Sequence, residues 1–432
     1  MMNSTIISIP PDGENVKSSD KQNEGKKFSF LPTSISFPLI KGEKWKQESK
    51  KKVIHSVKVG IALVLVSLVY LLDPLFAQVG ENAMWAIMTV VVVFEFSAGA
   101  TLSKGINRAI GTILGGGLGC LAAILADEFG GIGNAVVVGT SVFITGAAAT
   151  YSRLDPRIKR RYDYGAMIFI LTFNLVAVSD VRANKVIKLA KQRLSTIGLG
   201  FAVCIFTSLL VFPIWASDEL HRSTASKFEK LACCFQGRLE EYFAIPDNEE
   251  NLPNADVKDC KSVLHSKSTD ESLANFAKWE PWHGKFGFFY PWDKYLEIGE
   301  VLRELAALLL SLKVCIQSSQ QPEPNLRQGI KEPCEIIGLS LAWIMRELGE
   351  SILNMKRCRA KAVIAPKLQS IKQELSRLSS PLQIEGLEID ENLAISTFIF
   401  LLTEISESTQ LLADEVEKLG QLACFQAKKP DV

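Results

Sequence analysis

Six long apolar segments dominate the first half of the sequence, and amphipathic segments dominate the second half. An α-helix needs about 20 predominantly apolar residues to cross the hydrocarbon core of a bilayer. The apolar segments cover residues 53–72, 83–97, 109–126, 132–151, 164–179 and 193–215. The pattern predicts an all-α membrane protein, with six transmembrane helices within residues 50–216.

The remaining sequence is organised differently on either side of this apolar part. After residue 216, apolar side chains recur at the three- and four-residue spacing of a buried helix face, as in Ile337, Leu341, Ile344, Leu348 and Ile352. This predicts a C-terminal cytosolic helical domain over residues 217–432. Residues 1–49 are rich in Ser, Lys, Asn and Pro, which favours a disordered cytosolic tail.

Loop charges orient the predicted helices, because short loops rich in Lys and Arg face the cytosol. The basic loops contain residues 50–52, Lys104 with Arg108, and residues 153–161, and all fall on one side. The loops on the other side contain Asp73, Glu81, Asp127 and Glu128. Both termini are therefore expected in the cytosol. A basic segment after residue 181 lies outside in this topology and departs from the rule.

Composition narrows the class of protein. Hydrophobic residues make up 47% of the chain and the mean hydropathy is +0.16, which is high for a soluble protein. The net charge of +1 gives no sign of a nucleic-acid partner. The four His are scattered, the nine Cys show no CxxC spacing, and there is no P-loop pattern. We therefore expect free thiols, no metal or cofactor, and no enzymatic activity.

Two arginines lie at the ends of predicted transmembrane helices. Arg108 stands at the cytosolic end of the third helix and Arg193 at the outer end of the sixth, and Lys104 lies one turn before Arg108. One interpretation is that the arginines only extend their charges to the interface. The other is that they line an anion path, because a planar guanidinium holds a carboxylate bidentately. Conduction needs weak binding at several positions, and two separated basic constrictions meet that need.

Lys58 and Glu95 are expected at similar depth if the first two helices form a tight hairpin. A buried charge is costly without a partner, so we predict a structural ion pair between them, with a gating role as the alternative. The external segment carries Arg182, Lys185 and Lys188. This stripe fits a vestibule that attracts anions, and equally an amphipathic helix at the membrane surface.

Glycines recur in the third predicted transmembrane helix. Gly111, Gly115 and Gly119 follow a four-residue period, which lets helix backbones approach closely in lipid. We predict a packing face there, and the alternative is a flexible gate.

Several motifs in order resemble one family, the plant aluminium-activated malate transporters. The motifs lie at residues 58–67, 82–108, 161–165, 168–173, 192–197 and 212–215, and in the Trp279-Glu280-Pro281 motif of the soluble part. The resemblance covers nearly the whole chain. Each motif alone is weak, whereas the complete ordered set is highly specific.

The resemblance implies an anion channel for malate and other small anions. It implies a homodimer in a lipid membrane, with a pore between the subunits. The pore arginines of the family would fall on Arg108 and Arg193, and a constricting methionine on Met88. Lys104 and Lys58 would complete the anion-binding set. We place the protein in the plasma membrane in preference to the vacuolar membrane.

One feature departs from the family pattern. Aluminium-responsive members carry carboxylates in the external loops, whereas residues 182–191 contain no acid. A hard trivalent cation prefers anionic oxygens, so activation by aluminium is not expected. A secondary carrier that exports aromatic or dicarboxylic acids is the alternative function, and a membrane-bound enzyme is a more distant one.

Overall fold

A computed structural model describes residues 43–71, 84–178, 183–243, 255–287, 289–318, 322, 324–357, 363–379 and 389–427. Its elements are helical apart from one pair of two-residue strands. Residues 51–432 form one compact unit, and residues 1–50 are assigned to another. The first described helix, α1 (Glu43–Leu71), runs across this boundary.

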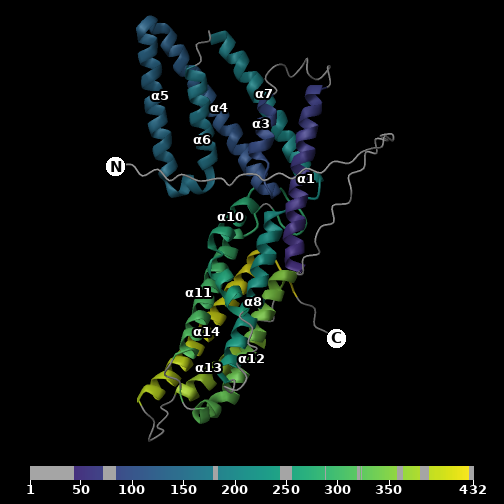
Figure 1. Ribbon diagram of the computed structural model, residues 1–432, viewed down its shortest axis with the longest axis vertical. Helices are drawn as coiled ribbons and strands as arrows, with labels where there is room; N and C mark the ends of the chain where they lie inside the picture. The colour runs from purple at the N-terminus through teal and green to yellow at the C-terminus, as the bar shows by residue number, and fades with distance from the viewer. Residues whose placement is uncertain are drawn as a thin grey trace, which may run out of the picture. The chain divides into compact units, whose positions relative to one another are not determined.

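The apolar first half forms a group of helices (Figure 1). These are α3 (Met84–Val93), α4 (Ala98–Phe129), α5 (Gly131–Leu154), α6 (Pro156–Val178) and α7 (Ala183–Leu210). Helix α4 packs on α5, α6 and α7, and α3 packs on α7. No residue of α5 is buried within the chain.

The prediction of six transmembrane helices is met in part. Among the described residues, only α4 and α5 are long and apolar enough to cross a membrane by length and composition. The apolar part of α3 has 10 residues, and α6 begins with a charged first third, so neither reaches that standard. Each of the six apolar segments nevertheless lies largely in a helix, and the all-α class holds.

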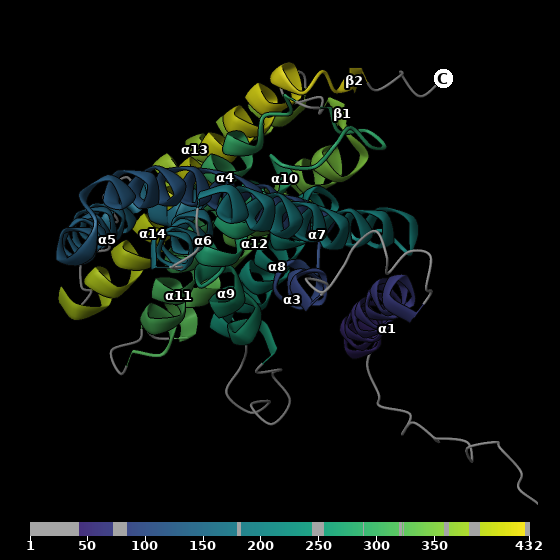
Figure 2. The same ribbon diagram turned by 90° about the horizontal axis from the view of Figure 1, so that it is seen from above.

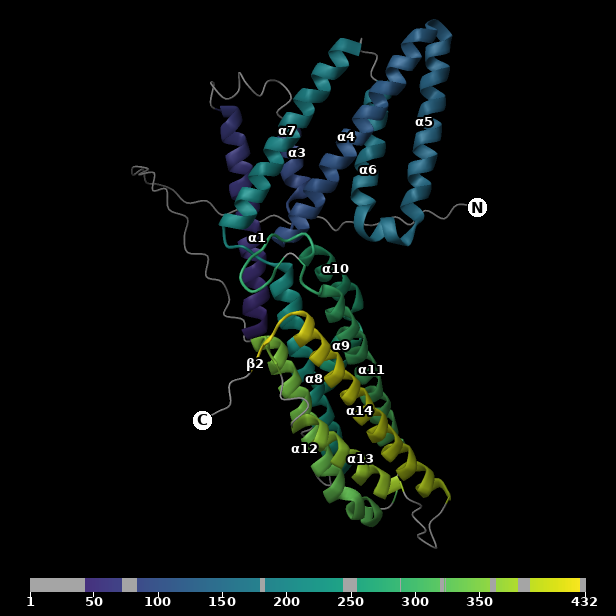
Figure 3. The same cartoon turned by 180° about the vertical axis from the view of Figure 1, so that it is seen from behind.

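The second half forms a helical bundle. It contains α8 (Ala216–Phe243), α9 (Ala255–Leu264), α10 (Lys267–Ala277), α11 (Trp292–Ile316), α12 (Pro324–Asn354), α13 (Ala365–Ser379) and α14 (Ile389–Leu422). Figure 3 shows α12 beside α8 and α11 beside α14. The apolar faces meet in one continuous core, in which Tyr242 stacks on Phe398 with ring centroids 4.0 Å apart.

Buried polar pairs and a short strand pair complete this bundle. Lys227 on α8 donates to Asp270 on α10 at 2.5 Å, and Arg303 approaches the same carboxylate at 3.5 Å. Strand β1 (Lys356–Arg357) pairs in parallel with β2 (Gln426–Ala427). Figure 2 shows the two strands beside each other.

The cysteines differ from expectation at one place. Cys234 and Cys260 form a disulfide, whereas free thiols were predicted throughout. The two residues are 26 apart in sequence, and packing of α8 on α9 brings them together.

Candidate functional site

A break in the second apolar segment shapes the charged region. Helix α3 ends at Val93 and α4 begins at Ala98, so residues 94–97 are not helical. Ser97 caps α4, because its hydroxyl accepts a hydrogen bond from the amide of Ala100 at 3.2 Å. The hydroxyl of Thr101 accepts from the amide of Glu95 at 3.0 Å. The break is therefore fixed by side-chain hydrogen bonds.

The early start of α4 corrects the position of Lys104. The sequence placed Lys104 in a loop before the third transmembrane helix, but it lies within α4, four residues before Arg108 and on the same face. Lys104 pairs with Glu95, and both side chains are about one-third exposed. A helix that begins directly after the break brings Lys104 back beside Glu95.

Lys58 has a different environment from the one predicted. Its side chain is buried, with the residue 1% exposed, and its Nζ donates to the carbonyl of Ser208 on α7 at 3.4 Å. The described residues show no hydrogen bond or ion pair between Lys58 and Glu95, whose carboxylate is paired with Lys104. Among these residues Lys58 has no carboxylate partner.

Arg108 is the second buried cation. The residue is 7% exposed, and its Nη1 donates to the hydroxyl of Tyr164 on α6 at 3.0 Å. Its Nε finds no hydrogen-bond partner among the described residues. The Nζ of Lys104 lies 5.9 Å from the centre of the Tyr164 ring, within cation–π range. Tyr164 lies in the family motif at residues 161–165, but sequence reasoning gave it no role, because nothing in its local sequence shows that it faces α4.

Glycines that follow Arg108 on α4 allow close packing of α4 on α6. A Cβ on Gly115 would lie 2.5 Å from the Phe169 carbonyl, and one on Gly119 would lie 2.9 Å from the Val176 Cβ. A Cβ on Gly111 would meet the carbonyl of Gly165. These contacts confirm the predicted packing face.

Other predicted site residues are placed only in part. Met88 lies on α3 and is 48% exposed. Arg193, Lys185 and Lys188 fall within α7, but their side chains lie outside the described part. Arg182 lies outside the described residues altogether. Their roles stay predictions.

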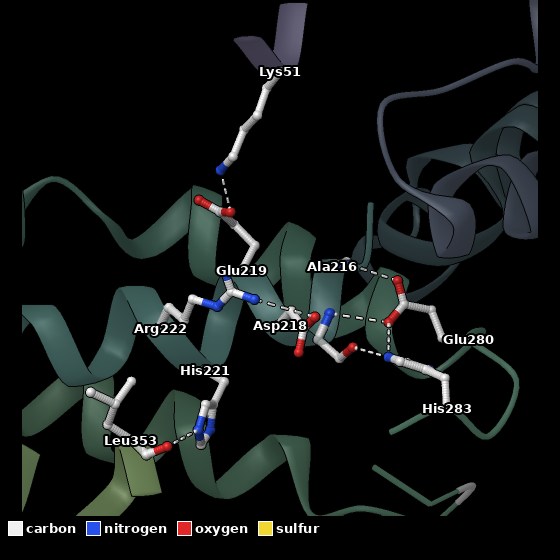
Figure 4. Close-up of polar contacts among 10 residues, drawn as sticks. Lys51, Ala216, Asp218, Glu219, His221, Arg222, Glu280, His283 and Leu353 are labelled. Carbon is white, nitrogen blue, oxygen red and sulfur yellow. Dashed lines mark hydrogen bonds and ion pairs between the residues drawn. The ribbon is translucent and has the colours of Figure 1, made fainter. Parts of the chain in front are cut away.

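The Trp279-Glu280-Pro281 motif meets the start of α8 (Figure 4). The carboxylate of Glu280 accepts from the amides of Ala216 and Ser217, at 2.6 and 3.1 Å. These amides belong to the first turn of α8, which lacks intrahelical partners and carries the positive end of the helix dipole. Glu280 therefore caps α8, although it lies more than 60 residues later in the chain.

His283 supports the same turn. Its Nδ1 lies 2.8 Å from the carbonyl of Pro281, which can only accept, so Nδ1 carries the hydrogen. The hydroxyl of Ser217 then donates to Nε2 at 2.9 Å. The imidazole also stacks on Trp215, with ring centroids 3.7 Å apart.

The motif also touches the apolar helices. The amide of Ala98, at the start of α4, donates to the carbonyl of Ile214 at 3.0 Å. A Cβ on Gly99 would lie 2.7 Å from the Cγ of Glu280. The guanidinium of Arg161 on α6 lies 5.3 Å from the Trp279 ring. The first turns of α4 and α8 thus converge on Glu280.

The described helices make the chain all-α, and two of them are long and apolar enough to cross a membrane, which is consistent with a membrane protein. The family model described as "Aluminium activated malate transporter" matches residues 44–385. The chain therefore belongs to this family, as the motifs suggested.

Curated relatives are similar in sequence to this chain over most of its length. It is 41% identical over 383 residues to aluminum-activated malate transporter 13 of Arabidopsis thaliana, covering 87% of this chain and 71% of the relative. It is 39% identical over 392 residues to transporter 2 of the same plant, covering 90% and 78%. Against transporter 1 of Triticum aestivum it is 37% identical over 404 residues, covering 89% and 85%. Against transporters 14 and 12 of Arabidopsis thaliana, the match spans 66% and 63% of the relative.

Proposed function

We propose that this chain is an anion channel that passes malate and other organic and inorganic anions across a plant membrane. In this proposal six helices span the bilayer, both termini are cytosolic, and the pore runs between the two subunits of a homodimer. The protein sits in the plasma membrane. Family membership supports the substrate class, because the relatives are named as malate transporters.

One observation carries the proposal. Lys58 and Arg108 are 1% and 7% exposed, and neither has a carboxylate partner among the described residues. An uncompensated buried cation is costly, and a passing anion reduces that cost while it is bound. Lys104 differs, because Glu95 already compensates its charge. We therefore assign Arg108 and Lys58 to the anion path and Lys104 to its wall.

The remaining parts of the path follow from sequence and resemblance. Arg193 provides the second basic constriction and Met88 the narrow apolar point. The stripe of Arg182, Lys185 and Lys188 concentrates anions at the outer mouth through its field. Helix α5 has no buried residue in the single chain, which leaves the face turned away from α4 and α6 available to lipid.

Oocyte recordings test the proposal. Wild type and Arg108→Gln are compared at matched surface abundance, with malate, nitrate or chloride on either side. The control is Arg157→Gln, which removes an exposed arginine at the start of α6. We expect anion currents several-fold smaller in Arg108→Gln and unchanged in the control. Wild-type currents in Arg108→Gln would refute the assignment, and saturable flux coupled to a second ion would favour the carrier.

A further inference from the structure

Tyr164 has a fixed position relative to the charged face of α4. The side-chain amide of Asn107 donates to the carbonyl of Arg161 at 3.1 Å, which sets the register of α6 against α4. Gly165, the next residue after Tyr164, is buried, and a Cβ there would lie 3.2 Å from the carbonyl of Asn107. This close packing fixes the backbone at Tyr164 against α4.

Tyr164 contacts two cations in different ways. Its hydroxyl oxygen accepts from Nη1 of Arg108 at 3.0 Å. Its ring lies 5.9 Å from Nζ of Lys104. A phenol can accept one hydrogen bond and still donate its own O–H. The Tyr164 hydroxyl therefore holds Arg108 and keeps a donor of its own.

Tyr164 engages one atom of the Arg108 guanidinium, and this determines which edge of the group remains to bind a carboxylate. A carboxylate binds a guanidinium through two parallel N–H bonds, and one such edge consists of Nε and Nη2. Tyr164 engages Nη1, on the other side of the group. Nε is buried and has no partner among the described residues. A buried donor of this kind is costly until an acceptor reaches it.

We propose that Tyr164 is a positioning residue that directs the Nε edge of Arg108 toward carboxylate anions. It thereby sets the preference of the path for carboxylates over chloride. A spherical chloride ion gains little from the planar fork, whereas a carboxylate matches it. This inference rests on the proposed anion channel and deepens it.

The test is the malate-to-chloride permeability ratio, taken from reversal potentials of the full chain in oocytes. Tyr164→Phe keeps the ring beneath Lys104 and removes only the hydroxyl. We expect the ratio to fall about tenfold, the equivalent of one charge-assisted hydrogen bond. In an Arg108→Gln background, Tyr164→Phe should change the ratio no further. Tyr162→Phe is the control, because Tyr162 is exposed on the same helix.

The possible outcomes separate the inference from the proposed function. An unchanged ratio in Tyr164→Phe overturns the inference, and so does an equal loss of all anion currents, which indicates a purely structural role. If Tyr164→Phe does not reach the surface, Tyr164→His carries the measurement. Histidine supplies a ring nitrogen that can accept from Arg108 in place of the phenol oxygen. A ratio between those of wild type and Arg108→Gln is therefore expected, and a ratio equal to that of Arg108→Gln overturns the inference. No anion current in wild type would refute the proposed function itself.

Discussion

Replacing Glu280 by Gln should destabilise the start of α8. The Glu280 side chain is 1% exposed and its two oxygens accept from the amides of Ala216 and Ser217. A Gln side chain has the same shape but only one oxygen. Its amide nitrogen would therefore face a backbone N–H, and one of the two helix donors would lose its acceptor.

The magnitude follows from these contacts. A hydrogen bond to a charged group contributes about 1.5–3 kcal/mol. Loss of the negative charge at the helix N-terminus adds about 0.3–1 kcal/mol. Because the carboxylate is buried, solvent does not screen either contribution. We expect the free energy of unfolding to fall by about 3 kcal/mol, which lowers Tm by about 6–12 °C for a domain of about 200 residues.

The assay heats the purified full chain in detergent to a series of temperatures. Size-exclusion chromatography then measures how much folded protein remains at each temperature. Glu304→Gln is the matched control, because Glu304 is exposed on α11 and should change stability by less than about 0.5 kcal/mol. Equal midpoints for Glu280→Gln and the control would refute the capping role of Glu280.

The remaining predictions concern charge pairs, pH and aluminium. Glu95→Lys should reduce the yield of folded protein in size-exclusion profiles, and adding Lys104→Glu should restore part of it; a double variant no better than the single would contradict the pairing. Burial lowers the pKa of His221, so the unfolded chain takes up a proton first as pH falls. The stability contributed by His221 is therefore present above about pH 6.5 and lost as the pH falls below it. As the pH is lowered, Tm should fall less steeply in His221→Gln than in wild type, and equal slopes would contradict this. Micromolar external aluminium should leave wild-type currents unchanged, whereas Asn184→Glu with Lys188→Asp should move the channel toward a response; a rapid current increase in wild type would place the sensor elsewhere.

Periodicity predicted most of the helices. The predicted stripe of Ile337, Leu341, Ile344, Leu348 and Ile352 is buried along α12. Apolar residues recur every three or four positions on a buried helix face, whichever element the face packs against. The helix can therefore be predicted from a short stretch of sequence. The choice of partner helix depends on side-chain shape over long separations, and the sequence does not show it.

The break at residues 94–97 could not be predicted from hydropathy, because Phe94 and Phe96 continue the apolar run. Ser97 is a typical N-cap residue, and it was the one local signal of a new helix. The missed break explains the difference at Glu95. Without it, Lys58 was the expected partner, whereas a helix starting at Ala98 brings Lys104 to Glu95.

The contacts of Glu280 and Tyr164 have no local signature. Glu280 caps amides 63 and 64 residues earlier in the chain, and Tyr164 binds an arginine 56 residues earlier. Family motifs included both residues, Tyr164 within residues 161–165 and Glu280 within the Trp279-Glu280-Pro281 motif, but they did not show what either side chain contacts. Both roles depend on close helix packing at glycines, Gly99 for the first and Gly165 for the second.

Recordings of the purified chain in a planar bilayer test the central claim most directly. The claim is that buried cations without carboxylate partners, Arg108 above all, form a path for anions. With a gradient of potassium malate across the bilayer, the account predicts unitary currents that reverse at the malate equilibrium potential and shrink in Arg108→Gln. Reversal at the potassium equilibrium potential, or flux without unitary steps, would contradict it.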